Sequence, residues 1–241
     1  MNSVQNHFDV IIVGAGISGI GAAYHLKTLS PDRSFQILEG RANFGGTWDL
    51  FRYPGVRSDS DMHTLGYRFK PWTADKSIAD GQAILDYLRE TITENNLGEK
   101  IRYNQHVAKA EWSTLSKTWT LSVVDKISNT ANTFSCNFLF MCSGYYSYKQ
   151  GFTPEFEGIQ NFNGTVVHPQ FWPQDLDYRN KRVVVIGSGA TAMTLVPAMA
   201  KDVAKITMLQ RSPTYVISRP SVDPFAKRMR RLYPKRIAYA L

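Results

Sequence analysis

The sequence contains the same three-part pattern twice: a run of β-branched residues, a turn rich in glycine, and a stretch with helical spacing. The first copy begins with Val10–Val13, a continuous apolar run typical of a strand buried on both faces. The turn that follows contains the candidate cofactor-binding residues Gly14, Gly16, Ser18 and Gly19. In such a turn the first glycine permits the bend, the second lets a pyrophosphate approach the backbone, and the third lets helix and strand pack closely. The pattern predicts a dinucleotide site at the helix start, where free backbone N–H groups face the phosphates.

A carboxylate closes this first unit. The next apolar run, SFQILE, ends at Glu39, twenty residues after Gly19. An acid at this spacing accepts hydrogen bonds from the ribose hydroxyls of a dinucleotide. Because a carboxylate repels a 2′-phosphate, Glu39 argues against NADP at this first site.

The loop after Glu39 indicates which dinucleotide binds. A nicotinamide dehydrogenase would continue into another strand–helix unit, but this chain enters a long loop rich in Gly, Arg, Trp and Asp. Long ordered loops in compact domains tend to be functional. The candidates in this loop are Gly46, Thr47, Trp48, Arg52, Arg57 and Asp59. A glycine pair for close approach, an indole wall and charged groups suit a large planar ring, so we expect FAD.

The second copy of the pattern has the opposite charge at its end. Its strand, Val183–Ile186, leads into a turn and helix with the candidates Gly187, Gly189, Ala190 and Thr191, and Ala192 takes the third glycine's place. The following strand, KITMLQRS, ends at Gln210, Arg211 and Ser212 instead of an acid. A guanidinium with a nearby hydroxyl suits a 2′-phosphate, so the second site predicts NADPH. Pro197 interrupts the helical pattern and is expected to kink the helix or to end its first part.

Two sites of opposite charge preference predict a hydride transfer from NADPH to a flavin. Two nicotinamide sites in one chain would make little chemical sense, whereas a nicotinamide and a flavin form a redox pair.

The middle of the chain predicts an insertion into the first dinucleotide fold. Residues 80–96 have the helical apolar spacing of Ile84, Leu85, Leu88 and Ile92. Residues 107–112 and 118–124 read as strands joined by a turn, and 133–144 read as a buried strand that returns toward the first phosphate site.

Composition and charge exclude several classes of protein. The net charge of +8 suits polyanionic ligands, and no apolar run is long enough to span a membrane. The N-terminus does not read as a signal peptide, and Cys136 and Cys142 read as thiols of a reducing, cytoplasmic compartment. The absence of a C-x-x-C pair argues against a disulfide reductase. The basic run KRMRRLYPKR lacks interleaved aromatics, so we expect a solvated helix face and no nucleic-acid partner.

Residues Phe162–Pro173, FNGTVVHPQFWP, join the two units and carry a family resemblance. They match F-x-G-x-x-x-H-x-x-x-W-P, and the chain resembles the Baeyer–Villiger flavin monooxygenases of the flavin-containing monooxygenase superfamily. GGTWDLFRYPGVRSDSDMHTLGYRF and LQRSPTY look closest to the ethionamide-activating subgroup. The related N- and S-oxidising flavin monooxygenases usually end the joining pattern in Tyr or Phe instead of Trp-Pro.

The resemblance implies an FAD- and NADPH-dependent monooxygenase. Such an enzyme inserts one oxygen atom of O₂ into a ketone, or oxidises sulfur, through a C4a-peroxyflavin. The implied catalytic residues are Asp59, which also lies at the flavin ring and orients an arginine, and His168 and Trp172, which act in a hinge between the domains. Val107 is a further implied cofactor-binding residue.

The expected fold is α/β, with two Rossmann-like dinucleotide-binding domains. The expected parts are an FAD domain with a small antiparallel insert over 1–150, a linker over 151–178, the start of an NADPH domain over 179–220 and the start of a helical substrate domain over 221–241. Because members of this family are roughly twice as long and take their catalytic arginine from later residues, we expect an N-terminal portion, with the missing half as a partner. The alternatives are a catalytically inactive FAD-binding fragment and an N- or S-oxidising enzyme.

Overall fold

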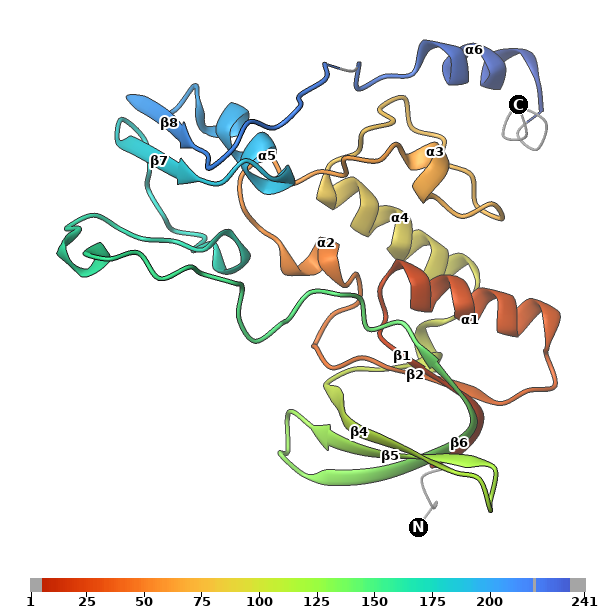
Figure 1. Ribbon diagram of the computed structural model, residues 1–241. Coiled ribbons are helices and arrows are strands. Elements are labelled where there is room, and N and C mark those ends of the chain that lie inside the picture. Colours follow the sequence, from red (N-terminus) through yellow and green to blue (C-terminus); the bar gives the residue numbers. More distant parts are fainter. Residues whose placement is uncertain (1–5, 219, 235–241) are drawn as a thin grey trace. The chain divides into compact units, whose positions relative to one another are not determined.

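The computed structural model describes residues 6–218 and 220–234 (Figure 1). It divides into two compact units: residues 1–50 with 85–146, and residues 51–84 with 147–241. The loop predicted to hold the flavin ring is therefore split between the units after Leu50. The domain boundaries expected from the sequence stay a prediction. They were defined by the cofactor that each domain is expected to bind, whereas the two units are defined by how compactly the chain packs.

The first unit is built on a six-stranded sheet with the order β3-β2-β1-β6-β5-β4. Strands β3, β2, β1 and β6 are parallel, whereas β5 and β4 continue the sheet as an antiparallel meander. The strands are β1 (His7–Val13), β2 (Phe35–Leu38), β3 (Ile101–Arg102), β4 (Gln105–Ser113), β5 (Thr118–Asp125) and β6 (Ala131–Met141). The sequence correctly predicted both the α/β class and the antiparallel insert.

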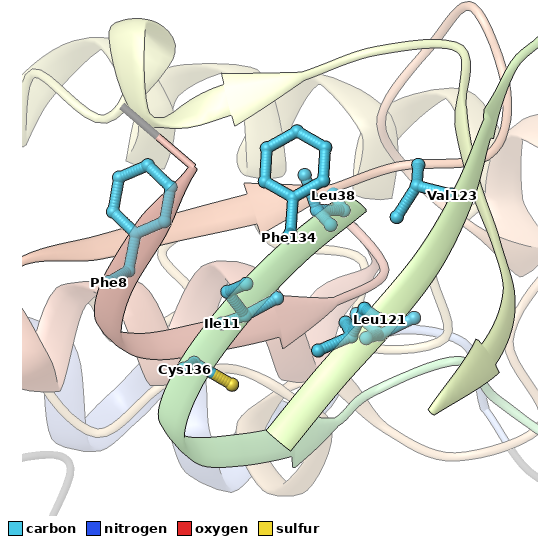
Figure 2. Close-up of a cluster of buried hydrophobic side chains, with 8 residues drawn as sticks. Phe8, Ile11, Leu38, Leu121, Val123, Phe134 and Cys136 are labelled. Carbon is cyan, nitrogen blue, oxygen red and sulfur yellow. The ribbon is translucent and has the colours of Figure 1, made fainter. Parts of the chain in front are cut away.

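Strand β1 is the centre of this sheet and is covered on both faces. Ile11 and Ile12 are completely buried, as a central parallel strand requires. Helix α1 (Ile17–Leu29) follows the first glycine turn and buries Ile20 and Ala23. A separate cluster contains Ile11 together with side chains from β2, β5 and β6, among them Leu38, Leu121, Phe134 and Cys136 (Figure 2).

Strand β6 has two differently paired halves. Its first half pairs with β5 as far as Cys136, while Ser135–Met141 pair with β1. The second half exposes large apolar side chains, with Phe138 59% and Phe140 43% exposed. In the register with β1 these two residues stand opposite Val10 and Ile12, both of which are buried. The side chains that bury β1 therefore do not also bury the second half of β6.

Helix α4 (Gly81–Glu94) confirms the helical spacing read from the sequence. Its four apolar candidates, Ile84, Leu85, Leu88 and Ile92, are all buried. The long loop that precedes it contains two short helices, α2 (Thr47–Leu50) and α3 (Met62–Leu65), where the sequence showed little helical pattern. At four residues each, these helices are too short to produce a periodic signal.

The second unit contains a parallel two-stranded sheet, β7 (Arg182–Ile186) and β8 (Lys205–Leu209), joined through α5 (Ala190–Met199). Pro197 lies in the last turn of α5, which ends two residues later, so it does not divide the helix. The face of the sheet toward α5 is partly buried, but Val184 and Leu209 on the other face are 60% and 54% exposed. The unit thus buries its sheet on one face only.

The basic run near the end forms α6 (Pro224–Leu232), with Asp223 as its N-cap. It is not wholly a solvated face, because Lys227 pairs with Asp75 at 2.7 Å and Arg230 donates to the carbonyl oxygen of Ala74 at 3.0 Å. Lys235 and Arg236 of the same run lie outside the described residues. Within the described part of the chain, no helix has the length and apolar character needed to cross a membrane.

Candidate dinucleotide-binding sites

The first glycine turn is enclosed by its neighbours in the sheet. Gly14 has φ +105°, and a Cβ there would lie 2.5 Å from the carbonyl oxygen of Cys142. A Cβ on Gly19 would lie 1.9 Å from the carbonyl oxygen of Gly14, so helix and strand touch backbone to backbone. Side chains are excluded at both positions, which agrees with the mechanical roles assigned to these glycines.

Glu39 reaches back from the end of β2 to this turn. Its Oε2 accepts a hydrogen bond from the backbone N–H of Ala15 at 2.7 Å, and its Oε1 accepts from the N–H of Arg41 at 3.0 Å. The side chain is buried, and this burial raises the pKa of the Glu39 carboxyl above its usual value despite the two N–H donors. The carboxylate is thus held beside the phosphate turn, where a ribose would lie.

The glycine pair after β2 also adopts conformations that favour glycine. Gly45 has φ +112° and Gly46 has φ +55°, and the N–H of Gly45 donates to the carbonyl oxygen of Ala15 at 2.9 Å. A Cβ on Gly16 would meet only the Cα of Gly46, at 3.8 Å. The glycine pair therefore lies against the phosphate turn and leaves Gly16 uncovered by side chains.

Most of the residues predicted to bind the flavin belong to the first unit. Ser18 is exposed in the first turn of α1, while Thr47 and Trp48 begin α2 directly after the glycine pair. Val107 lies in β4 at a shift in its register with β5. Asp59 is exposed and belongs to the second unit.

The second glycine turn repeats the backbone geometry of the first in open surroundings. Gly187 has φ +121°, and the N-cap residue Gly189 is extended, with no side chain capping α5. A Cβ on either glycine would have no neighbouring atom within 4 Å. Ala190 and Thr191 start the helix, so their backbone N–H groups stand at the positive end of its dipole.

The predicted phosphate clamp lies at the end of β8. The N–H of Gly187 donates to the carbonyl oxygen of Leu209 at 2.8 Å, which joins the second turn to the strand that ends just before Arg211. Arg211 and Ser212 are both exposed. Ser188 and Thr214 share a hydroxyl hydrogen bond at 2.9 Å, which ties the chain beyond Ser212 back to the turn.

The joining motif is anchored inside the second unit. The ring of His168 lies directly on Gly151, where a Cβ would be 2.0 Å from Cε1, and its Nδ1 accepts from the N–H of Gln170 at 3.2 Å. The ring of Trp172 packs edge-to-face against that of Tyr178, with 6.1 Å between the ring centroids. Trp172 also contacts the apolar cluster that contains Leu195 and Met199 of α5. These contacts are packing and local capping, and the hinge role of both residues stays a prediction.

Sequence reasoning missed two residues that shape the first site. Asp49 is buried, and its Oδ2 forms an ion pair at 2.8 Å with Arg41, which also donates to the carbonyl oxygen of Gly46 at 3.3 Å. This pair fixes the backbone beside the glycine pair. The sequence does show a charged residue on each side of the glycine pair, Arg41 before it and Asp49 after it. Only the fold shows that these two side chains form an ion pair.

Comparison with known proteins identifies the family. Residues 74–238 match the model of the flavin-binding monooxygenase-like family, and residues 12–74 match that of an NAD(P)-binding Rossmann-like domain. The chain belongs to the flavin-binding monooxygenase-like family. This confirms the resemblance read from the joining motif.

Several curated relatives of this monooxygenase-like chain are about equally similar. It is 53% identical over 237 residues to the FAD-containing monooxygenase EthA of Mycobacterium tuberculosis, a match that covers 98% of the chain and 48% of EthA. It is 51% identical to the probable FAD-binding monooxygenase AlmA of Acinetobacter baylyi, again over 48% of that protein. The chain therefore spans about half the length of the curated relatives it matches.

Solved monooxygenase structures share its fold. An oxidized steroid monooxygenase bound to NADP superimposes with a TM-score of 0.79 at 30% identity, covering 97% of this chain and 43% of that one. Cyclohexanone monooxygenase from Rhodococcus sp. Phi1 bound to NADP⁺ superimposes with a TM-score of 0.73 at 26% identity. The match covers 88% of this chain and 40% of that one.

Both sites of the chain fit a dinucleotide. The first has a bare Gly16, an uncapped start of α1 and the Glu39 carboxylate on the same turn. The second has an uncapped start of α5 beneath two glycines with open space around them. Each therefore offers backbone donors to a pyrophosphate, and they differ in the charge at the following strand end.

Proposed function

We propose that this chain binds FAD at its first turn and NADPH at its second, and that it forms the cofactor-binding half of a monooxygenase. The observation that carries this proposal is the contrast between two otherwise equivalent strand ends. Glu39, at the end of β2, is buried and bonded to the phosphate turn, whereas Arg211, just after β8, is exposed beside the other turn. A carboxylate favours a free ribose diol, and a guanidinium favours a 2′-phosphate.

The chain's own residues would orient the two cofactors. Glu39 accepts from the ribose of FAD, and the N–H groups at the start of α1 receive its pyrophosphate. Gly46, Thr47 and Trp48 line the approach to its ring, which supplies the site of hydride acceptance and of the reaction with O₂. Arg211 and Ser212 bind the 2′-phosphate of NADPH.

The reaction we propose is the conversion of a ketone, O₂, NADPH and a proton into an ester, NADP⁺ and water. The joining motif supports the ketone over sulfur as the preferred target, because its Trp172-Pro173 ending is the one associated with Baeyer–Villiger oxidation. In this proposal Asp59 orients an arginine at the flavin ring, and His168 and Trp172 set the conformation of the linker.

A second candidate function is a cofactor-binding module that turns nothing over until a second polypeptide completes it. The exposed apolar faces support this candidate: Phe138 and Phe140 on β6, and Val184 and Leu209 on the two-stranded sheet. A parallel sheet is normally covered on both faces. The partner would be the half of the relatives' length that this chain does not span.

Cofactor binding by the purified chain tests the proposal. We expect a flavin absorption spectrum after incubation with FAD and gel filtration, and tighter calorimetric binding of NADPH than of NADH. Arg211→Ala should lower NADPH affinity by roughly 10- to 100-fold and leave NADH unchanged, since a charge-assisted hydrogen bond contributes about 1.5–3 kcal/mol. Arg182→Ala, at the opposite end of the same sheet, is the matched control. Equal affinity for the two coenzymes before and after Arg211→Ala would contradict the NADPH assignment.

Product analysis tests whether the chain needs a second polypeptide for turnover. The chain would be mixed with FAD, NADPH and a cyclic ketone, alone and with the remaining half of M. tuberculosis EthA. Ester from the chain alone supports a self-sufficient enzyme, and ester only from the mixture supports the module. Preferential oxidation of a paired sulfide would overturn the ketone assignment.

A further inference from the structure

Arg41 contacts two separate parts of the first site. Its backbone N–H donates to Oε1 of Glu39 at 3.0 Å, and its carbonyl oxygen accepts from the N–H of Asn104 at 2.9 Å. Its side chain reaches into the loop that follows: Nη1 donates to the carbonyl oxygen of Gly46 at 3.3 Å, and Nη2 forms the ion pair with Asp49 at 2.8 Å. One residue therefore contacts both the strand-end carboxylate and the glycine pair.

The Asp49 carboxylate restrains the guanidinium of Arg41. The Asp49 side chain is only 7% exposed, so its half of the ion pair is shielded from water. Nη2 also donates to the backbone carbonyl oxygen of Asp49 at 3.4 Å, and a Cβ on Gly45 would lie 3.3 Å from the Cβ of Asp49. A planar guanidinium presents its donors in a fixed fork, so its contacts with Gly46 and Asp49 restrain each other.

The glycine pair that Arg41 contacts lies against the phosphate turn. The N–H of Gly45 donates to the carbonyl oxygen of Ala15 at 2.9 Å. The place where a Cβ would stand on Gly16 is 3.8 Å from the Cα of Gly46. A shift of the glycine pair would therefore change the space beside Gly16, where a pyrophosphate approaches the backbone.

The two charges of the ion pair act on Glu39 in opposite directions. Burial has the largest effect and raises the pKa of the Glu39 carboxyl, and the negative charge of Asp49 raises it further. The N–H donors of Ala15 and Arg41 and the positive charge of Arg41 lower this pKa. An ionised carboxylate accepts a stronger hydrogen bond from a ribose hydroxyl than a neutral carboxyl does. The charge of Arg41 thus favours the form of Glu39 that binds ribose better.

The connection between β3 and β4 brings further ionisable groups to Glu39. The carbonyl oxygen of Arg102 accepts from the N–H of Glu39 at 2.9 Å. Burial, and then the charge of Glu39, raise the pKa of the Tyr103 phenol. A Cβ on Gly40 would lie 3.4 Å from Nδ1 of His106. These three side chains stay the same in every variant used below, so their influence on Glu39 is common to all of them.

We propose that Arg41 is a positioning residue for FAD: through its contacts with Glu39 and Gly46 it holds the ribose acceptor and the glycine pair in the geometry that binds the cofactor. This inference rests on the proposed FAD site and adds a residue that acts through two others. Loss of the ion pair alone would affect variants of Arg41 and Asp49 alike. The positioning role separates them, because only Arg41 contacts Gly46 through its side chain and only its charge favours ionised Glu39.

Titration of the full chain with FAD, followed by flavin fluorescence between about pH 4 and 8, tests this role. At the upper end of this range Arg41→Gln should weaken FAD binding by about tenfold, because the charge-assisted contact with the glycine pair is lost. Asp49→Asn should weaken it by about twofold or less, since the guanidinium keeps its bond to Gly46.

The pH at which FAD affinity declines should move in opposite directions in the two variants. Affinity falls as pH falls through the pKa of Glu39, because the carboxylate takes up a proton. Arg41→Gln removes a charge that lowers this pKa, so the decline should begin at higher pH than in the unaltered chain. Asp49→Asn removes a charge that raises it, so the decline should begin at lower pH.

Two further variants serve as controls. Arg33→Gln breaks the ion pair of Arg33 with Asp9, at 3.3 Å in the same unit, and should change neither the affinity nor its pH dependence. The double variant Arg41→Gln/Asp49→Asn leaves no buried carboxylate without its cation, a situation that can unfold a protein. Compared with Asp49→Asn alone, it should show the same loss of about tenfold, and this comparison replaces Arg41→Gln if that variant does not fold.

Amide exchange of the chain without FAD gives an independent measure. The N–H of Gly45 should exchange faster in the double variant than in Asp49→Asn, and Arg33→Gln should leave it unchanged. The positioning role is overturned by unchanged FAD affinity on loss of Arg41, by an equal loss in Arg33→Gln, or by pH profiles that move the same way in Arg41→Gln and Asp49→Asn. If the unaltered chain binds no FAD, the proposed function is wrong. The Gly45 amide then decides the positioning role alone: faster exchange supports it and unchanged exchange overturns it.

Discussion

The two phosphate turns have nearly the same backbone and very different surroundings. Gly14 and Gly187 have φ of +105° and +121°, and the N-caps Gly16 and Gly189 are both extended. Yet a Cβ on Gly14 would meet the chain at Cys142, whereas a Cβ on Gly187 would meet nothing. Turn geometry is thus a local property, and enclosure depends on which strands lie beside the turn.

The enclosing strand in the first unit is β6. Strand β1 lies between β2 and β6, so the carboxyl end of β6 comes directly beside the turn. Strand β7 pairs only with β8 among the described residues, and its other edge has no strand partner there. The comparison predicts that equivalent substitutions will have unequal effects in the two units.

The largest difference is expected at the third position of each turn. Gly19→Ala should destabilise the first unit by about 3 kcal/mol or more, since overpacking against backbone cannot be relieved by a rotamer change. Ala192→Gly should cost the second unit only about 1 kcal/mol, the ordinary penalty for glycine in a helix. Native-state amide exchange, read separately for β1 and for β7, measures both. Equal losses would show that the helix–strand contact is no tighter in the first unit.

The first position of each turn should show a smaller difference. Gly14→Ala and Gly187→Ala both place a Cβ at positive φ, which costs about 1–2 kcal/mol. Only Gly14→Ala adds a clash with the carbonyl oxygen of Cys142, which we expect to cost about 1–3 kcal/mol more. The same exchange measurement tests this, and a larger loss in Gly187→Ala would contradict the enclosure of the first turn by β6.

Equivalent strand residues should also respond unequally. Ile12 in β1 is fully buried, whereas Ile186 in β7 is 54% exposed. Ile12→Thr should destabilise the first unit by about 2 kcal/mol, through lost apolar burial and a buried hydroxyl. Ile186→Thr should change the second unit by less than about 0.5 kcal/mol. Urea titration followed by amide exchange in each strand distinguishes them, and a large loss at Ile186 would mean that another surface covers this face in solution.

The smallest effect concerns pH and the strand-end carboxylate. Because burial raises the pKa of Glu39, the folded first unit binds its proton more tightly than the unfolded chain does. The stabilisation that this provides is present below the ordinary pKa of 4.5 and is lost as pH rises through the raised value. Relative to Glu39→Gln, the unaltered first unit should therefore lose unfolding free energy as pH rises toward neutral.

A matched change in the second unit completes the pH comparison. Gln210 is exposed at the corresponding place after β8, so Gln210→Glu should add no such pH dependence. Urea unfolding between pH 4 and 7, about the range in which carboxyl groups titrate, measures both variants. A pH dependence in the Gln210→Glu variant as steep as that of Glu39 would refute burial as the cause.

The sequence predicted the elements well where the signal is local or periodic. The two glycine turns, the buried apolar side of α4 and the meander of β4 and β5 follow from spacing and residue type. Short helices such as α2 gave no such signal. The pairing of α6 with the loop around Asp75 joins residues about 150 positions apart, a separation that no local pattern reports.

The candidate site divides in the same way. The glycines, Glu39 and Arg211 were identifiable from sequence because their chemistry depends on a position relative to a strand end. The Arg41–Asp49 pair was not, because it arises from a contact that only the folded loop makes. An arginine or an aspartate in a loop has no pattern that distinguishes a buried ion pair from two exposed side chains.

By itself the sequence determined the two strand–turn–helix units and the sign of the charge that closes each one. These depend on backbone conformations and residue types that are set within about twenty residues. Only the tertiary structure decided which turn is enclosed, which sheet face is bare, and that residues 51–84 group with the second unit. The reason is that burial depends on the segments a residue meets in space, and those segments can lie anywhere in the chain.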